Sequence, residues 1–165
     1  MGRHPLRHLV SACVLGLAAG TASAVSTFLF IPGVPGESVD DRHRDWIDLH
    51  SVSVGVADRA CTGFTVTKNL DKSSPLLSGA AMTGSVYPTM TVEVLSDGID
   101  RYAFLTYTLT NVVVGSVQAT TTATVPVVES VGLVPAAITM SYRPRKPDGS
   151  LDAAVNFTLT CAKKH

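Results

Sequence analysis

A short stretch near the start of the chain carries four side chains of the types that bind metal ions: Asp40, Asp41, His43 and Asp45. Carboxylate oxygens and imidazole nitrogens are common ligands of divalent cations. A calcium-binding loop also needs a glycine at its sixth position and a glutamate at its end, and this stretch has neither. We therefore interpret it as a solvated, charged loop and predict no metal site.

The other chemistry-bearing residues do not fall into a catalytic pattern. The sequence has no G-x-S-x-G turn, no H-E-x-x-H pair, no phosphate-binding loop and no C-x-x-C pair. His50 lies in a strand-like segment, where a satisfied or exposed histidine is favoured over a catalytic one. The spacing of serine, histidine and aspartate gives no reason to expect a triad. The sequence thus predicts a protein that is not an enzyme and uses no cofactor.

The first 24 residues have the order of a secretory signal peptide. Arg3 and Arg7 give a positive start, and an apolar run from Leu9 to Ala19 follows. Small residues then precede a predicted cleavage site between Ala24 and Val25. The apolar run is shorter than the ~20 residues of a membrane-spanning helix. A buried N-terminal helix is the alternative, which the glycines and hydroxyl residues of this segment disfavour.

Cleavage divides the chain into a signal peptide, residues 1–24, and a single domain, residues 25–165. We expect the domain to contain no integral membrane segment and to be secreted or periplasmic. Two cysteines remain in it, Cys61 and Cys161. An even pair in an exported chain can form a disulfide. Two separate buried thiols are the alternative, because the sequence does not show whether the two Cα atoms come close enough.

Composition points to a β-rich fold. The chain has 165 residues, of which 45% are hydrophobic and 16% charged, and its formal net charge is zero. Such a chain can bury a core, and its balanced charge provides no basic surface for nucleic acid. It contains 22 valines and 18 threonines, β-branched residues that favour strands.

Apolar runs, and segments in which apolar and polar residues alternate, predict the strands that position the residues discussed above. The expected strands cover 28–31, 46–56, 61–68, 86–94, 102–118, 125–142 and 153–161, with Gly132 and Pro135 interrupting the sixth. The threonine-rich stretch 120–124 is expected to be an exposed loop tip. The many short strands with turns between them predict a compact antiparallel barrel or two-sheet sandwich.

One short helix is expected beside the strands, over residues 75–83. Ser74 is predicted to cap its free amides and Pro75 to occupy its first position. An apolar stripe at helical spacing follows, formed by Leu76, Leu77, Ala80 and Ala81. Gly84 is predicted to end the helix in a left-handed conformation.

Several blocks of the sequence resemble the haemolysin-coregulated protein (Hcp) family, in order and over nearly the whole predicted domain. The combination of Gly-Glu-Ser with Thr-Lys-x-x-Asp-Lys-Ser-Ser-Pro is the most specific part. The blocks are IPGVPGES (31–38), DWID (45–48), FTVTK (64–68), DKSSPLL (71–77), YP (87–88), YTLTNV (107–112), ESV (129–131) and YRPRKPDG (142–149).

This resemblance implies a compact β-barrel of two sheets with one helix at its side. It also implies a subunit of the hexameric rings that stack into the inner tube of the type VI secretion system, carry small effectors and have no catalytic centre. The early charged loop then helps to contact the neighbouring ring; its residues here are Glu37, Asp40, Asp41, Arg42, Arg44 and Asp45. The predicted signal peptide departs from the family pattern, whose tube proteins are loaded from the cytoplasm.

Two functional hypotheses follow. The first is an exported Hcp-like structural protein that forms a hexameric ring or tube associated with type VI secretion, with secreted effector proteins as further partners. The second is a monomeric secreted or periplasmic binding module that uses the same barrel. The signal peptide and the possible disulfide favour the second, and the near-full-length resemblance favours the first.

Overall fold

The computed structural model describes residues 25–58, 60–98, 100–123 and 125–161. The predicted signal peptide, with Ala24 at its cleavage site, lies outside these residues. Within them, no helix is long and apolar enough to cross a membrane.

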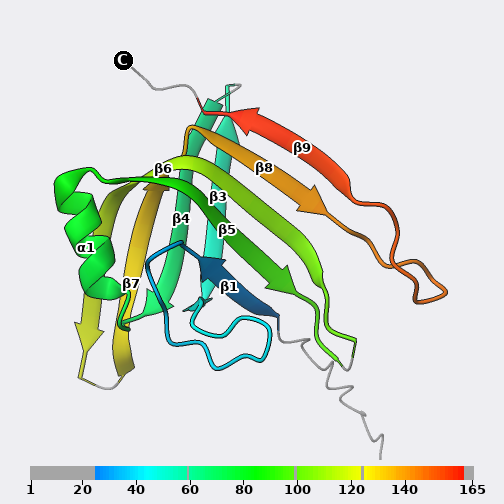
Figure 1. Ribbon diagram of the computed structural model, residues 1–165, viewed down its shortest axis with the longest axis horizontal. Coiled ribbons are helices and arrows are strands. Elements are labelled where there is room, and N and C mark those ends of the chain that lie inside the picture. Colours follow the sequence, from blue (N-terminus) through cyan, green and yellow to red (C-terminus); the bar gives the residue numbers. More distant parts are fainter. Residues whose placement is uncertain (1–24, 59, 99, 124, 162–165) are drawn as a thin grey trace, which may run out of the picture.

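The described chain forms nine strands and one helix (Figure 1). Their bounds are β1 Ser26–Phe30, β2 Ile47–Leu49, β3 Ser51–Ala57, β4 Ala60–Asn69, α1 Ser74–Thr83, β5 Val86–Leu95, β6 Ala103–Thr122, β7 Val125–Val134, β8 Ala137–Tyr142 and β9 Val155–Thr160.

All strand pairs are antiparallel and belong to one strongly curved sheet (Figure 1). The main path runs β2-β1-β5-β6-β7-β4-β3, and β8 and β9 branch from β6. The mainly β, antiparallel fold with one short side helix, expected from the strand patterns, is confirmed.

The core lies inside the curve of the sheet, and the alternation of side chains explains its position. In β4, Phe64 and Val66 are buried while Thr65 between them is more exposed, because successive strand residues face opposite sides. The same alternation buries Met90 and Val92 in β5. Buried apolar side chains from the rest of the chain join them, among them Leu29, Ile31, Ile47, Leu77, Leu109, Val112 and Val131.

The segment 46–56 was predicted as one strand, and the structure corrects this. It forms β2 and β3, separated by His50. β2 pairs with β1, whereas β3 pairs with β4 at the other end of the sheet. The His50 amide donates a hydrogen bond to the Thr67 carbonyl (2.8 Å). The chain changes partners at this residue, so the two ends of the sheet meet there.

The long strand β6 serves two neighbours on one of its edges. Its first half, Leu105–Thr110, pairs with β8, and its second half, from Val113 onward, pairs with β7. Asn111 lies at the change of partner and has a positive φ of 48°, a conformation that asparagine tolerates better than β-branched residues.

The ends of β6 and β7 also differ from expectation. The stretch 120–124 is not wholly a loop, because β6 continues through Thr122 and β7 begins at Val125. β7 runs through Gly132, which lies opposite Ser116 at a register shift, and ends just before Pro135. The cross-strand ladder therefore overrides the local turn preference of these residues.

Helix α1 begins and ends where expected, but its first turn is arranged differently. The N-cap residue is Ser73, and it makes no side-chain cap bond to the helix. The Ser74 hydroxyl, predicted as the cap, points instead to buried charged groups of β4 and β7. Gly84 ends the helix in the left-handed region (φ 67°), as predicted. Leu77 and Ala80 are buried, but Leu76 is 46% exposed, so the apolar stripe is narrower than expected.

Candidate functional site

The charged loop that follows β1 is held to the body by a buried histidine. His43 Nδ1 lies 2.9 Å from Asp40 Oδ1, and its Nε2 lies 2.8 Å from Glu93 Oε2 in β5. The ring also stacks on Phe28, with centroids 4.4 Å apart, and meets Trp46 edge to face. Both ring nitrogens therefore lie within hydrogen-bond distance of a carboxylate oxygen.

This arrangement corrects the prediction that the loop is simply solvated. Asp40 and His43 face inward, whereas the other predicted ring-contact residues, Glu37, Asp41, Arg42, Arg44 and Asp45, are exposed. No group of three or more side chains able to hold a metal ion occurs among the described residues. His50, also considered in the sequence, is exposed, and its Nε2 lies 2.7 Å from Asn69 Oδ1.

Asp40 organises the loop through several hydrogen bonds. Burial alone would raise its pKa, but bonds from the His43 ring, the Arg101 guanidinium and the Arg42 amide outweigh burial and hold the pKa well below its usual range. Arg101 Nη1 lies 2.7 Å from Asp40 Oδ2, which ties the loop to the connection between β5 and β6. The Arg42 guanidinium donates to the Arg101 carbonyl at the same place (2.7 Å).

Replacing Asp40 by asparagine should therefore lower stability at neutral pH. Because the folded-state pKa is depressed, the carboxylate contributes its full stabilisation above its unfolded-state pKa of about 4. That contribution is lost as the pH falls below this value. Urea unfolding of the original protein and the variant at a series of pH values should show a difference in the free energy of unfolding that becomes smaller in acid. The exposed Asp41→Asn variant is the matched control, and an equal difference at every pH would contradict the interpretation.

Three separate blocks of the family resemblance meet at the base of this loop. The Lys72 amide donates to Glu37 Oε1 (3.2 Å), and Lys72 Nζ lies 3.0 Å from Asp45 Oδ1. Gly36 packs so closely on the backbone of Trp46 that an added Cβ would overlap it. The loop is therefore positioned by the start of α1 and by its own backbone.

A second polar cluster lies in the core, where β4, β7 and the start of α1 meet. Lys68 is fully buried, and its Nζ lies 2.9 Å from Glu129 Oε2 and 2.8 Å from Asp71 Oδ1. The Ser74 hydroxyl donates to Glu129 and accepts a bond from Lys68 (2.9 Å). Within the described ranges, no buried side-chain nitrogen or oxygen lacks a partner. The cluster fixes α1 to the sheet and has no open access for a substrate.

Reasoning from the sequence did not identify this cluster, although the pattern contains a clue. Lys68 continues the buried alternation of Phe64 and Val66, and a charged residue at such a position requires a buried partner. Glu129 lies directly opposite Lys68 in the ladder between β4 and β7. The pairing of these two strands, and hence the partner, could not be read from spacing alone.

The strands β8 and β9 extend the sheet outward from β6 (Figure 1): β8 pairs along its whole length with β6, and β9 lies outside it; we call these two strands the arm. On one face of the arm, Met140 pairs with Phe157 and Tyr142 pairs with Val155. All four are exposed, Phe157 by 58% and Val155 by 66%. The face continues the core-facing side of β6, because Ile138, one pair nearer the core, is buried opposite Leu109.

The other face of the arm is polar. It carries Thr139 and Ser141 opposite Thr158 and Asn156, and the two threonine hydroxyls lie 3.0 Å apart. An apolar face of this kind, left uncovered beside a covered core, is typical of a surface that packs against another protein. We call the face formed by Met140, Tyr142, Val155 and Phe157 the arm surface.

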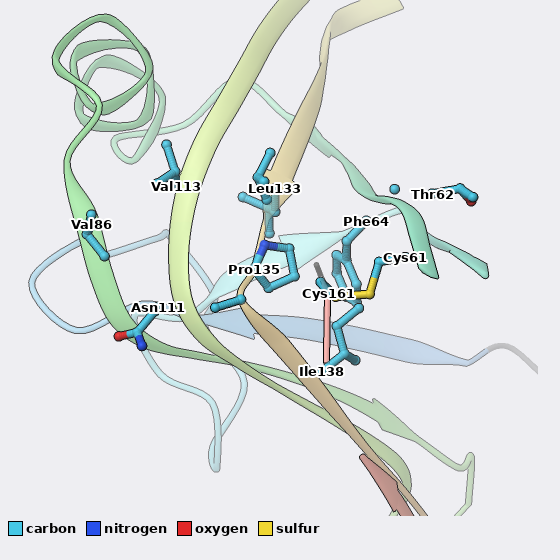
Figure 2. Close-up of a pocket in the computed structure, with 13 residues that line it drawn as sticks. Cys61, Thr62, Phe64, Val86, Asn111, Val113, Leu133, Pro135, Ile138 and Cys161 are labelled. Atoms are coloured by element: carbon cyan, nitrogen blue, oxygen red, sulfur yellow. A yellow bond between two sulfur atoms is a disulfide. The ribbon is translucent and has the colours of Figure 1, made fainter. Parts of the chain in front are cut away.

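An apolar pocket of about 420 Å³ lies where the arm joins the body. Figure 2 shows the disulfide between Cys61 and Cys161 on one side of it and Asn111 on the other. The two Cα atoms of the disulfide are 5.1 Å apart, so of the two arrangements left open by the sequence the structure has the bonded one. The apolar walls of the pocket include Phe64, Val113, Leu133 and Ile138. Among the residues that the structure describes, no charged side chain lines the pocket, which suits an apolar group.

Comparison with known proteins adds to these observations. A family model described as type VI secretion system effector, Hcp, matches residues 28–142. Protein Hcp1 of Pseudomonas aeruginosa is 30% identical over 150 residues, which cover 78% of this chain and 90% of the relative.

Solved structures have the same fold. Hcp1 from Salmonella typhimurium superposes with a TM-score of 0.74 at 23% identity, covering 83% of this chain and 94% of that one. A structure described as a type six secretion system protein has a TM-score of 0.74 at 26% identity, covering 80% and 92% of the two chains.

Proposed function

This chain belongs to the Hcp family of type VI secretion system proteins, and from that premise we propose that it is a non-catalytic structural subunit that assembles into a hexameric ring. The observation that supports the proposal most directly is the arm surface, an exposed apolar face with a polar opposite face. A second copy of the chain would cover it and remove its apolar area from water. The exposed residues of the charged loop are proposed to contact a neighbouring ring, and effector proteins are proposed as further partners.

We propose further that residues 1–24 act as a signal peptide cleaved between Ala24 and Val25, so that residues 25–165 reach the periplasm or the medium. The disulfide supports this proposal, because such bonds persist mainly in oxidising compartments. N-terminal sequencing of protein recovered outside the cytoplasm should begin at Val25. Recovery of the intact initiator segment there would contradict the cleavage.

A monomeric exported binding module is the second candidate function. The apolar pocket beside the disulfide favours it, because a barrel that binds a partner or ligand needs such a concave surface. Size-exclusion chromatography with light scattering on residues 25–165 separates the two candidates. Six subunits per particle would support the ring, and a single subunit at high protein concentration would reject it.

Replacing Phe157 by glutamate should disrupt the assembly. The new carboxylate would lie at the centre of the arm surface, where covering it with a neighbouring subunit would bury an unpaired charge. Light scattering should then show a shift from assembled particles to single subunits, with circular dichroism unchanged.

The matched control is Asn156→Glu, which places the same charge one residue away on the polar face of the same strand. This variant should assemble like the original protein. Equal behaviour of the two variants would show that the arm surface is not the interface.

A further inference from the structure

The strands around the apolar pocket form a circuit with one unpaired junction. Going round it, β4 pairs with β7, β7 with β6, β6 with β8 and β8 with β9. Between β9 and β4, the described residues make no ladder of hydrogen bonds. The disulfide joins Cys61 in β4 to Cys161, directly after β9, at this junction. We call the junction the β4–β9 seam.

The arm has few other attachments on the β9 side. Within the described ranges β9 pairs only with β8, and most of its side chains are exposed. The Cys161 amide donates to the Ala136 carbonyl (2.8 Å), which continues the ladder with β8 and adds no bond to β4. Without the disulfide, the seam would depend on side-chain packing alone.

The pocket lies directly behind the seam. Both cysteines line it, together with the buried side chains of Phe64, Leu133 and Ile138 (Figure 2). Separation of β9 from β4 would therefore expose apolar core residues to solvent or to a partner.

From these observations we infer that the Cys61–Cys161 bond is a redox latch, which holds the β4–β9 seam closed beside the apolar pocket when oxidised and lets β9 separate from β4 when reduced. The inference goes beyond assembly into a ring and does not depend on it. A disulfide is suited to this role because it replaces, with one reversible covalent bond, the ladder that is missing at the seam.

The reaction is thiol–disulfide exchange with a small disulfide such as oxidised glutathione. The thiolate of one cysteine attacks a sulfur of the glutathione disulfide and releases one glutathione thiolate. The second cysteine thiolate then attacks the mixed disulfide and releases the other. The protein loses two electrons and two protons, and the small disulfide gains them as two thiols. A small dithiol reverses both steps, and the partly buried cysteines at an open pocket give it access.

The latch makes the shape of the protein depend on its compartment. A chain in a reducing compartment holds two thiols and an open seam, whereas in an oxidising compartment the seam closes. The apolar residues behind the seam would then be reached by a partner only before oxidation or after reduction.

Hydrogen exchange on the full chain, oxidised and then reduced with dithiothreitol, tests the inference. Reduction should speed amide exchange in β9 and at the start of β4 by about tenfold or more, and by a larger factor than in the β5–β6 ladder, where exchange follows only the change in global stability. Anilinonaphthalene sulfonate, a dye that binds exposed apolar surface, should fluoresce several-fold more with the reduced protein. The double variant Cys61→Ser, Cys161→Ser should behave as the reduced protein with and without dithiothreitol.

Three results would overturn the inference. Unchanged exchange at the seam would mean that packing alone closes it. Exchange accelerated by the same factor throughout the sheet would mean that the bond acts only on global stability and not as a local latch. Light scattering on the same samples measures the particle mass. If exchange becomes faster only when the particle mass also falls, the change is due to disassembly of the particles.

Discussion

Replacing Lys68 by methionine should lower the free energy of unfolding by about 3–5 kcal/mol, the usual cost of removing one member of a buried ion pair. Methionine keeps much of the apolar stem but removes the ammonium group. Glu129 and Asp71, each within 2.9 Å of that group, would then be left near one another in the core without a cation. Urea unfolding followed by circular dichroism measures the loss.

The chain contains a control for this substitution. Lys72 also pairs with a carboxylate, that of Asp45, but both side chains are largely exposed. Lys72→Met should cost less than ~1 kcal/mol, because surface ion pairs contribute little. Similar losses for the two variants would show that the buried cluster has no special role in stability.

Removal of the disulfide should have a comparable effect. The double variant Cys61→Ser, Cys161→Ser should be less stable by about 4 kcal/mol, because the bond closes a long loop and restricts the unfolded chain. The loop spans a sequence separation of 100 residues. Urea unfolding should also show a steeper dependence on denaturant, since an unfolded chain without the cross-link exposes more surface.

Reduced original protein serves as the control for this variant. If the bond itself is responsible, the reduced protein and the double variant should unfold at the same urea concentration. A variant as stable as the oxidised protein would show that the bond adds nothing to stability, whatever its effect on the seam.

The sequence predicted the helix and most strands of the fold well, but it predicted poorly which strands pair with one another. Alternation in β4 and β5 identified both strands, and the Ser-Ser-Pro start and Gly84 identified α1, because these patterns act within a few residues. The break at His50 was missed because nothing local distinguishes it. It arises because β2 pairs with β1 whereas β3 pairs with β4, and this change of partner depends on the arrangement of the whole sheet.

The candidate sites divide in the same way. The cysteines and the charged loop were identified from residue types alone. The inward turn of His43 depends on Glu93, a residue of β5 distant in sequence. The arm surface depends on the register of β8 against β9, which pairs Met140 with Phe157. A contact between distant segments has no local pattern, so neither feature could be read from the sequence.

The long separation between the two cysteines has a consequence for protein synthesis. Cys61 leaves the ribosome well before Cys161, and β4 cannot complete its ladder until β7 has been translated. During that interval Cys61 is an unpaired thiol on an incomplete sheet, available to any other cysteine it meets. Correct cross-linking must therefore wait until translation has passed Cys161.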